Sequence, residues 1–303
     1  MGQKGWPWSP IRGSESASDD LPHISIVTPS YNQGRFLEQA IRSVLLQGYP
    51  NLEYMVFDGG STDESVSILR RFSEHLAYWR SEPDGGQAQA INMGFERASG
   101  EILAWLNSDD LLLPGALHRV AEMQRRHPKA AAWVGACYRI EPSGRLLRLV
   151  RPRGLDRESI ADWDGEGFFY QPSCFFSAAA WRDAGPLDEG LRYAFDVDLW
   201  IRLAGVGGYV AMEEVLSAAV IHEDAKTQAE RTGMHAETMA VQIRHGYRKA
   251  AEARLARLLE RASSRRNGGR RPLRRLRHRL RALQVWRSGT DSSAACRFPL
   301  REL

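Results

Sequence analysis

Residues 24–58 read ISIVTPSYNQGRFLEQAIRSVLLQGYPNLEYMVFD, and this segment sets the expected architecture. The β-branched run at 24–28 is typical of a strand, which Pro29 ends. Apolar residues then recur at helical spacing over 36–45, before a glycine and a proline close the helix. Residues 54–57 form the next predicted strand. The segment is therefore a strand–helix–strand unit of the kind that builds parallel sheets.

Strands and helices continue to alternate after this unit. A capping-box spacing at Ser61–Glu64 predicts the start of a second helix, which extends to Phe72. A strand at 76–79, a helix at 87–98 and a strand at 102–106 follow. This alternation predicts an α/β fold, with a sheet of mostly parallel strands flanked by helices on both faces.

The second half is less regular. It contains an apolar, aromatic segment over 168–177 and, directly after the last predicted strand, His222. The other predicted elements are extended segments at 132–136 and 138–140, a hairpin turn at 142–145, a helix at 194–204, and strands at 209–212 and 215–221.

Composition excludes several classes of protein. The 303 residues are 43% hydrophobic and 26% charged, which is sufficient for a sizeable core. No run approaches the roughly 18 apolar residues of a membrane-spanning helix. Residues 1–20 lack the apolar core of a secretory signal, so no cleaved signal is expected. The three cysteines are far apart, which favours reduced thiols over a disulfide scaffold or a Cys-rich zinc site.

Charge is distributed unevenly along the chain. Residues 226–303 contain 20 Lys and Arg against 6 Asp and Glu, whereas residues 1–225 contain 21 against 31. We therefore expect a flexible leader, an acidic α/β domain in two halves, and a basic amphipathic helical tail. The expected boundaries are 1–22 for the leader, 23–225 for the domain with halves at 23–112 and 113–225, and 226–303 for the tail.

Polar clusters follow four of the predicted strands, and they begin at Pro29, Asp58, Glu82 and Asn107. Because ligands of parallel sheets bind at the carboxyl ends of the strands, these clusters are expected at one edge. The adjacent carboxylates of Asp109 and Asp110 would repel each other unless a cation joined them, and oxygen ligands suit Mg²⁺ or Mn²⁺. Their spacing is equally consistent with a cap at the start of a helix. The absence of G-x-G-x-x-G and G-x-x-x-x-G-K-[ST] disfavours a dinucleotide or P-loop site.

Five segments together, in this order, resemble the family 2 inverting glycosyltransferases, which have the GT-A fold. The segments are Ile26–Asn32, Asp58–Asp63, Asn107–Asp110, Gln171–Ser173 and Phe195–Trp200. In that family, the corresponding segments face the nucleotide, the uracil and ribose, the metal, the acceptor and the catalytic base. The resemblance covers roughly two thirds of the chain, from Ile24 to His222.

The resemblance implies a role for each matching residue. Asp196 would be the catalytic base, and Asp109, Asp110 and His222 would hold a divalent cation, Mn²⁺ or Mg²⁺. The donor would be bound by Pro29, Ser30, Tyr31, Asn32, Asp58, Gly86, Gln87, Asn107 and Ser108. Two positions depart from the family pattern. Asn107 stands where the D-x-D metal motif has its first Asp, and Phe195 stands where a Glu precedes the base, which leaves Asp198 as a substitute.

Several of these residues also have structural explanations. Tyr31 would be explained as well by packing, and a lone histidine such as His222 is commonly structural. Trp200 and Arg202 would be a core aromatic and a salt-bridged arginine, or acceptor contacts on the helix that carries Asp196.

The implied activity is an inverting, metal-dependent transfer of a sugar from a nucleoside diphosphate sugar to a hydroxyl of a glycan or lipid-linked oligosaccharide. The resemblance favours uridine diphosphate, leaves guanosine and thymidine diphosphates open, and suggests cell-surface polysaccharide synthesis. A sugar-nucleotide nucleotidyltransferase is an alternative, although the loop at 29–35 is not glycine-rich. A degenerate, non-catalytic transferase domain acting as an adaptor is another, against which the three carboxylates Asp58, Asp109 and Asp196 argue.

The basic tail carries a separate expectation. Residues 272–286 combine leucines at helical spacing with arginines on the other face, which is typical of an interfacial helix. Attraction to anionic lipid would hold a cytoplasmic enzyme at the inner face of the cytoplasmic membrane. Docking of the tail on the acidic domain, or a contact between subunits, is the main alternative. Nucleic-acid binding is disfavoured, because no recognisable nucleic-acid-binding fold accompanies the charge.

Overall fold

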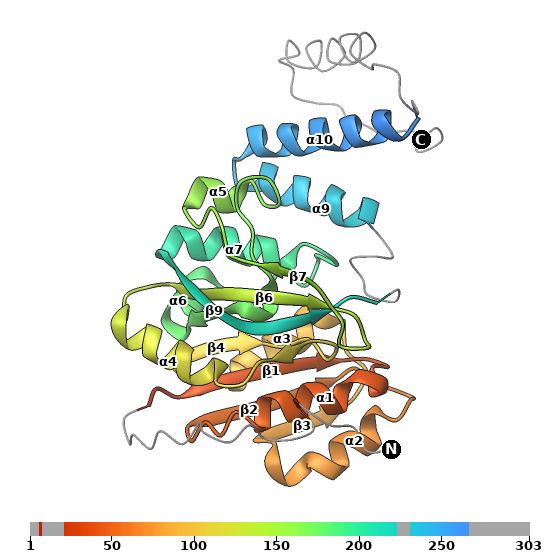
Figure 1. Cartoon of the computed structure of the whole chain (residues 1–303), viewed down its shortest axis with the longest axis vertical. Helices are drawn as coiled ribbons and strands as arrows, with labels where there is room; N and C mark the ends of the chain where they lie inside the picture. The colour runs from red at the N-terminus through yellow and green to blue at the C-terminus, as the bar shows by residue number, and fades with distance from the viewer. Residues whose placement is uncertain (1–5, 8–20, 223–230, 267–303) are drawn as a thin grey trace. The chain divides into compact units, whose positions relative to one another are not determined.

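The structure is a computed structural model that describes residues 6–7, 21–222 and 231–266 (Figure 1). Most of the predicted leader, and the predicted interfacial helix at 272–286, lie outside the described residues. The strands are β1 (Ile24–Ser30), β2 (Leu52–Asp58), β3 (Tyr78–Ser81), β4 (Ile102–Trp105), β5 (Leu111–Leu112), β6 (Ala132–Ile140), β7 (Leu146–Val150), β8 (Cys174–Ser177) and β9 (Tyr209–Val220). The α-helices are α1 (Gly34–Leu45), α2 (Ser65–Phe72), α3 (Gln87–Arg97), α4 (Ala116–Arg126), α5 (Arg157–Ala161), α6 (Ala178–Ala184), α7 (Phe195–Val206), α9 (Arg231–Arg244) and α10 (Arg248–Arg266). Short 3₁₀ helices are η1 (Ser73–His75) and η2 (Gln171–Ser173).

The strands join one mixed sheet in the order β3-β2-β1-β4-β8-β6-β9-β5, and β7 pairs with β6. Strands β1 to β4 pair in parallel, as the alternation of elements predicts. Strands β6 and β9 are also parallel, whereas the remaining pairs are antiparallel and each includes a strand after β4. The predicted α/β sheet flanked by helices is therefore confirmed, and it becomes mixed in its second half.

The central strands divide their side chains between two hydrophobic cores. In β4, Ile102 and Ala104 belong to the core that includes α1, α2 and α4, whereas Leu103 and Trp105 belong to the core that includes α3, α6 and α7. A period of two is the geometry of a strand, and burial on both faces is typical of parallel sheets covered by helices. The two cores thus lie on opposite faces of the sheet.

Two close contacts fix helices to the sheet. Gly94 lets α3 lie directly on β1, because a Cβ atom at this position would lie 2.5 Å from the side chain of Val27. On the same face, the rings of Trp105 in β4 and Trp200 in α7 stack with centroids 5.3 Å apart and planes 7° apart. These contacts set the positions of the helices that start beside the carboxyl edge.

The predicted capping box at Ser61–Glu64 is wrong. Helix α2 begins at Ser65, because both the amide and the hydroxyl of Ser61 donate to Asp58, at 2.8 and 2.6 Å. The amide of Ser65 instead donates to Asp63 at 3.0 Å. The extended segments predicted separately at 132–136 and 138–140 form one strand, β6, and those at 209–221 form β9. The hairpin turn at 142–145 joins β6 to β7 as predicted.

Helix α9 falls within the predicted helical tail at 226–303, but sequence analysis does not predict that it belongs to the domain. The first compact unit extends to Arg254 and includes this helix, whereas the predicted domain ends at residue 225. Val241 of α9 lies in the same core as Trp200. The second unit, Leu255–Leu303, contains the remainder of α10.

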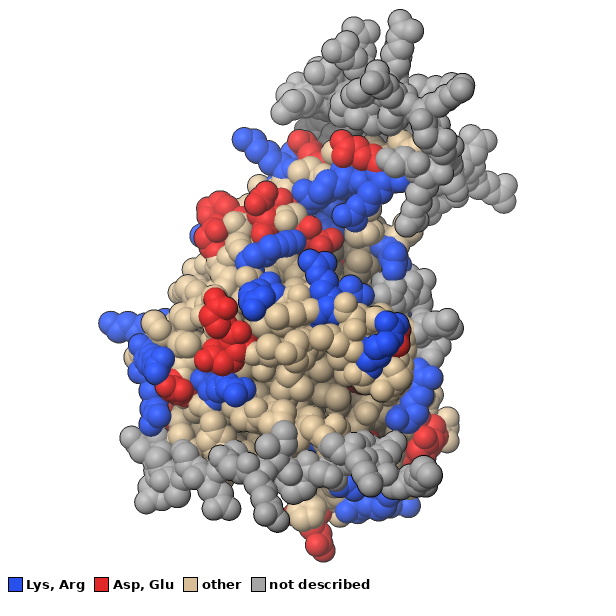
Figure 2. Space-filling view, in the orientation of Figure 1, with Lys and Arg blue, Asp and Glu red and all other residues tan. Residues whose placement is uncertain are grey.

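Charged side chains of both signs lie on the face of the described residues that Figure 2 shows. Figure 2 shows acidic and basic groups side by side around an uncharged central area. Most of the arginine-rich tail lies outside the described residues. Among the helices that the structure describes, none combines the length and the apolar character needed to cross a membrane.

Candidate active site

The carboxyl ends of the parallel strands bring the predicted polar clusters to one edge. Ser30 pairs with Asp58 in register, and Asp58 pairs with Ser81, so β1, β2 and β3 end side by side. Strand β4 pairs with β1 from the other side. The loops that follow these strands therefore share one rim, as expected for a doubly covered parallel sheet.

The loop after β1 is held to the loop after β2 by Asn32. The backbone amide of Asn32 donates to the Ser61 hydroxyl at 2.7 Å, and its side-chain oxygen Oδ1 accepts from the Thr62 backbone amide at 2.9 Å. Asn32 has a φ of 51°, a left-handed conformation that asparagine tolerates better than most residues. Tyr31 is 63% exposed, so it does not serve as packing. Its ring is presented to solvent at the rim.

Asp58, which was predicted to bind the sugar donor, is buried, and both of its carboxylate oxygens already accept hydrogen bonds. Its carboxylate accepts from the amide and hydroxyl of Ser61 and, at 2.6 Å, from the hydroxyl of Ser81. These bonds join the ends of β2 and β3, so the structure shows Asp58 as an organiser of the rim. The neighbouring residues of β1 are buried too, and the Ser30 hydroxyl has no hydrogen-bond partner in the part of the chain that the structure describes.

The start of α3 lies beside the loop after β4. Gly86 precedes the helix with a φ of 115°, a conformation that side chains rarely adopt. The amide side chain of Gln87 donates to Asn107 Oδ1 at 2.7 Å. Asn107 in turn donates to Gln171 Oε1 at 3.2 Å, and Gln171 donates to the carbonyl of Trp105 at 2.8 Å. Residues from three separate segments thus converge after β4, and Ser108 is buried among them.

The two predicted metal carboxylates have different surroundings. Asp110 is buried, and Oδ1 accepts from the Val220 amide at 3.2 Å. Burial, and then the charge of Asp109, raise the pKa of Asp110 well above its usual range. Asp109 is more exposed, and its Oδ2 lies 3.0 Å from Nε2 of His222, at the end of β9. Of the two carboxylates, Asp109 is the one that faces the predicted histidine ligand.

The tautomer of His222 follows from its second neighbour. Nη2 of Arg35 lies 3.2 Å from Nδ1, and a guanidinium can only donate. Nδ1 therefore accepts, which leaves the proton on Nε2, directed at Asp109. A cation on Nε2 would have to displace this proton and release the Arg35 contact. Asp109 and His222 form a carboxylate–imidazole pair, and the described residues hold no larger cluster of acidic, histidine or cysteine side chains suited to a metal.

The predicted base, Asp196, lies in the first turn of α7. It is partly buried, and its Oδ1 accepts from the Val197 amide at 2.7 Å. Burial raises the pKa of Asp196 to about 6, although the nearby amides act in the opposite direction. Within the described ranges, no basic side chain forms an ion pair with it. The loop before α7 is joined to α3 by Asn92, which bonds both the amide and the carbonyl of Leu187.

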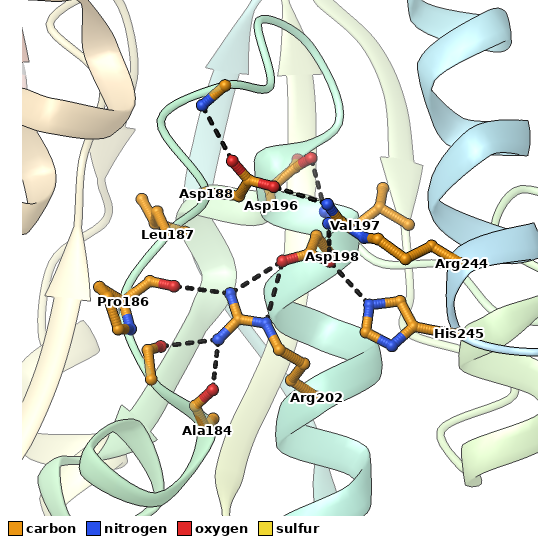
Figure 3. Close-up of polar contacts among 12 residues, drawn as sticks. Ala184, Pro186, Leu187, Asp188, Asp196, Val197, Asp198, Arg202, Arg244 and His245 are labelled. Atoms are coloured by element: carbon orange, nitrogen blue, oxygen red, sulfur yellow. Dashed lines mark hydrogen bonds and ion pairs between the residues drawn. The ribbon is translucent and has the colours of Figure 1, made fainter.

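The substitute base, Asp198, is excluded by its contacts (Figure 3). It is buried and accepts from Arg202 at 2.9 Å, from His245 at 2.7 Å and from Arg244 at 2.5 Å. Burial raises its pKa, but these hydrogen bonds and charges outweigh that effect and hold the pKa below its usual range. Asp198 therefore stays ionised and paired. The structure also makes Arg202 a salt-bridged arginine and Trp200 a core residue, as their structural explanations required.

Sequence reasoning did not assign four contributors to the site. Ser81 completes the shell of Asp58, and Gln171, noted only for its motif, links the loop after β4 to η2. Arg244 and His245 reach Asp198 from beyond the predicted domain. Only the strand-end position of Ser81 gave a local signal, because the other partners are 46 or more residues apart in sequence.

Comparisons with known proteins identify the family and the fold. The model of the family described as glycosyl transferase family 2 matches residues 25–180. An uncharacterized glycosyltransferase of Rickettsia typhi is 29% identical over 213 residues, which cover 68% of this chain and 66% of that protein. A Campylobacter jejuni protein named GalNAc(5)-diNAcBac-PP-undecaprenol beta-1,3-glucosyltransferase is 32% identical over 49% of this chain, and the match spans only 51% of its own length.

Solved structures show the same fold. Residues 1–349 of Staphylococcus aureus TarS, in complex with UDP-GlcNAc, match with a TM-score of 0.61 and 18% identity, over 81% of this chain and 74% of that one. The Pyrobaculum calidifontis mannosyltransferase PcManGT, in complex with GDP-Man and Mn²⁺, matches with a TM-score of 0.57 and 20% identity, over 88% of this chain and 81% of that one. The GT-A-type sheet expected from the resemblance is thus the one observed.

Proposed function

Since the chain belongs to glycosyl transferase family 2, we propose that it transfers a sugar from a UDP-sugar to a hydroxyl of a glycan or lipid-linked oligosaccharide, with inversion at the anomeric carbon. The observation that carries the proposal is the meeting of Asp109 and His222, 3.0 Å apart, at the rim where the parallel strands end. Two residues that are 113 positions apart in sequence form a polar pair at the edge where such sheets bind their ligands.

The donor would lie along this rim. The exposed ring of Tyr31 offers a face on which a nucleobase can stack. Asn32 and Thr62 hold the two flanking loops together without occupying that ring. The TarS fragment binds UDP-GlcNAc and PcManGT binds GDP-Man, so both nucleotides belong in the test, with UDP as the proposed one.

A divalent cation would be held by Asp109, with His222 as a second ligand once Arg35 is released. A carboxylate and an imidazole suit Mn²⁺ better than Mg²⁺, which favours oxygen ligands. When bound, such a cation stabilises the negative charge that develops on the departing diphosphate. Asp110 would not bind the cation directly but would hold the loop of Asp109 against β9, since its Oδ1 accepts from the Val220 amide.

Asp196 would accept the proton of the acceptor hydroxyl. A base is useful when its pKa is below, but close to, the working pH, and a pKa of about 6 meets that condition near neutrality. General-base assistance contributes about 10²–10⁴ to a rate. The paired Asp198 cannot take this role, because its carboxylate is bound by Arg202, Arg244 and His245.

Nucleotide-dependent unfolding tests the donor class. We expect UDP with Mn²⁺ to raise the Tm, since a ligand at about 100 times its Kd adds about 2.7 kcal/mol of stability. Asp109→Asn should abolish the shift, whereas Asp183→Asn, an exposed site on α6, should retain it. A shift with GDP alone would correct the donor, and no shift with UDP, GDP or dTDP would contradict the proposal. Release of UDP from UDP-sugars, with product anomers assigned by NMR, then tests transfer and inversion.

The membrane proposal rests on the sequence of residues 272–286 and on the acceptor class. The Campylobacter relative is named for an undecaprenol-linked acceptor, and such an acceptor would bring a cytoplasmic enzyme to the inner face of the membrane. Sedimentation with vesicles tests this, because binding should require anionic lipid and fall with added salt. Binding to neutral vesicles, or none at all, would contradict it.

A further inference from the structure

Helix α9 reaches the helix of the proposed base from outside the region that the family model matches. The match covers residues 25–180, whereas α9 spans Arg231–Arg244. It lies in the first compact unit and contacts the loop before α7 closely, since a Cβ atom at Gly233 would lie 2.9 Å from the Tyr193 ring. Two side chains of α9, Glu237 and Arg244, bond the segment on either side of Asp196, and so does His245, which directly follows the helix.

Glu237 holds the residues that lead into α7. Its two carboxylate oxygens accept from the amides of Arg192, Tyr193 and Ala194, at 3.1, 2.6 and 3.0 Å. The first amides of a helix lack partners within the helix, and a negative charge near them is favourable. Glu237 therefore binds the amide of Ala194, the residue that precedes α7, and fixes the two residues before it, while the Val197 amide is bound locally by Asp196.

Arg244 and His245 hold the other side. Arg244 bridges two carboxylates, Asp188 at 2.6 Å and Asp198 at 2.5 Å, and so joins the loop to the helix (Figure 3). His245 adds a bond to the same oxygen of Asp198 at 2.7 Å. The segment from Asp188 to Asp198 is thereby fixed before and after Asp196, which itself bonds no side chain of α9 among the residues described.

We propose that Glu237, Arg244 and His245 are positioning residues for the Asp196 carboxylate, so that α9 is part of the catalytic unit. The inference rests on the role proposed for Asp196. A base must lie within hydrogen-bond reach of the proton that it removes. A misplacement of about 1 Å caused by a change away from the chemistry can lower a rate about 10²-fold. Glu237, Arg244 and His245, together called the clamp, hold the turn that carries Asp196 from both sides.

The test uses the full chain with Glu237→Gln, which keeps the size of the side chain and removes its charge. Glu252→Gln, at an exposed position early in α10, is the matched control. Arg244→Lys is the second variant, because an ammonium lacks the planar fork that reaches both carboxylates. The first readout is hydrogen exchange of the amides at 192–198, which needs no substrate. Exchange should rise about tenfold in both clamp variants and stay unchanged in the control.

Two further readouts separate positioning from plain structural support. The titration of Asp196, followed by ¹³C NMR of its carboxyl carbon and assigned with Asp196→Asn, should move from about 6 toward 3.8 as water gains access. With donor and acceptor present, kcat should fall at least about tenfold while the donor KM changes less than about twofold.

The outcomes are distinct. Unchanged exchange, or increased exchange with unchanged Asp196 titration and kcat, would overturn the inference. If the wild-type chain transfers no sugar, the proposed function fails, while exchange and the Asp196 titration still decide whether α9 positions this carboxylate. If Glu237→Gln does not fold, Arg244→Lys decides by the same readouts, and failure of both to fold would show a structural role and overturn the inference.

Discussion

Replacing Asp196 by asparagine should stabilise the fold while it removes the proposed base. The amide side chain keeps an oxygen for the Val197 N–H, so the local hydrogen bond survives. The charge does not survive, and the partly buried carboxylate has no basic partner among the described residues to offset its loss of hydration. The structure therefore predicts opposite effects on stability and on turnover.

The size of the gain follows from the pKa. Burial raises the pKa of Asp196 from 3.8 to about 6. One pKa unit corresponds to about 1.4 kcal/mol, so ionisation costs the folded state up to about 3 kcal/mol above pH 6. Between these pKa values Asp196 binds more protons in the folded state than in the unfolded state, so the contribution of Asp196 to wild-type stability should fall as the pH rises. At about pH 3 and below, well under the unfolded pKa of 3.8, the group is protonated in both states, and the cost vanishes.

Urea unfolding of the wild type and of Asp196→Asn at pH 4, 5, 6 and 7.5 measures this difference. The variant should exceed the wild type by less than about 1 kcal/mol at pH 4 and by up to about 3 kcal/mol at pH 7.5. Its turnover should fall about 10²–10⁴-fold. Asp183→Asn, on the exposed surface of α6, should show no pH-dependent gain. A difference that does not vary with pH, or a variant less stable than the wild type at pH 7.5, would refute the reasoning.

Three other substitutions have definite expected outcomes. Asp198→Asn should lower the free energy of unfolding by about 3–5 kcal/mol at pH 7, because Arg202 would lose its buried ionic partner. The loss should shrink as the pH falls through the low pKa of this carboxyl, and an equal loss at pH 3 would contradict the ionic explanation. Tyr31→Ala should change unfolding by less than about 0.5 kcal/mol, since the ring is exposed, but weaken UDP binding by about 1–3 kcal/mol in calorimetry. Unchanged UDP affinity would remove the stacking role. Gly94→Ala should cost about 1–3 kcal/mol, because the added methyl would meet Val27 at 2.5 Å. A neutral result in thermal unfolding would show that α3 can move away from β1.

The first half of the fold was predictable because its signals are local. Strands β1 to β4 are short apolar runs that end in polar clusters, and the parallel pairing places those clusters at one edge. The identity of the rim follows from that rule alone. The role of each polar cluster at the rim does not follow from that rule, since the carboxylate of Asp58 accepts hydrogen bonds from Ser61 and Ser81.

The rest depends on contacts between distant segments. The serine of the apparent capping box is engaged by Asp58, so α2 starts later than its sequence indicates. Asp196 and Asp198 both lie in the first turn of α7, and three side chains occupy Asp198 alone. The i,i+4 spacing of Arg202 was a local signal of this difference, whereas Arg244 and His245 lie 46 and 47 residues after Asp198. A spacing rule cannot reach so far, because it describes neighbours on one helix or strand.

The stacked rings of Trp105 in β4 and Trp200 in α7 join the two halves of the α/β domain, so that this strand and this helix move together as a rigid body. Strand β4 leads to the rim that would bind the donor, and α7 carries Asp196, so sliding or tilting between them would first have to separate two indoles. Closure over a substrate is therefore left to the surface loops, such as the one that bears Tyr31. The pair is also an optical reporter, because parallel indoles this close couple their electronic transitions. The contribution of this pair to the circular dichroism spectrum should persist through substrate binding and disappear only when the helix leaves the sheet.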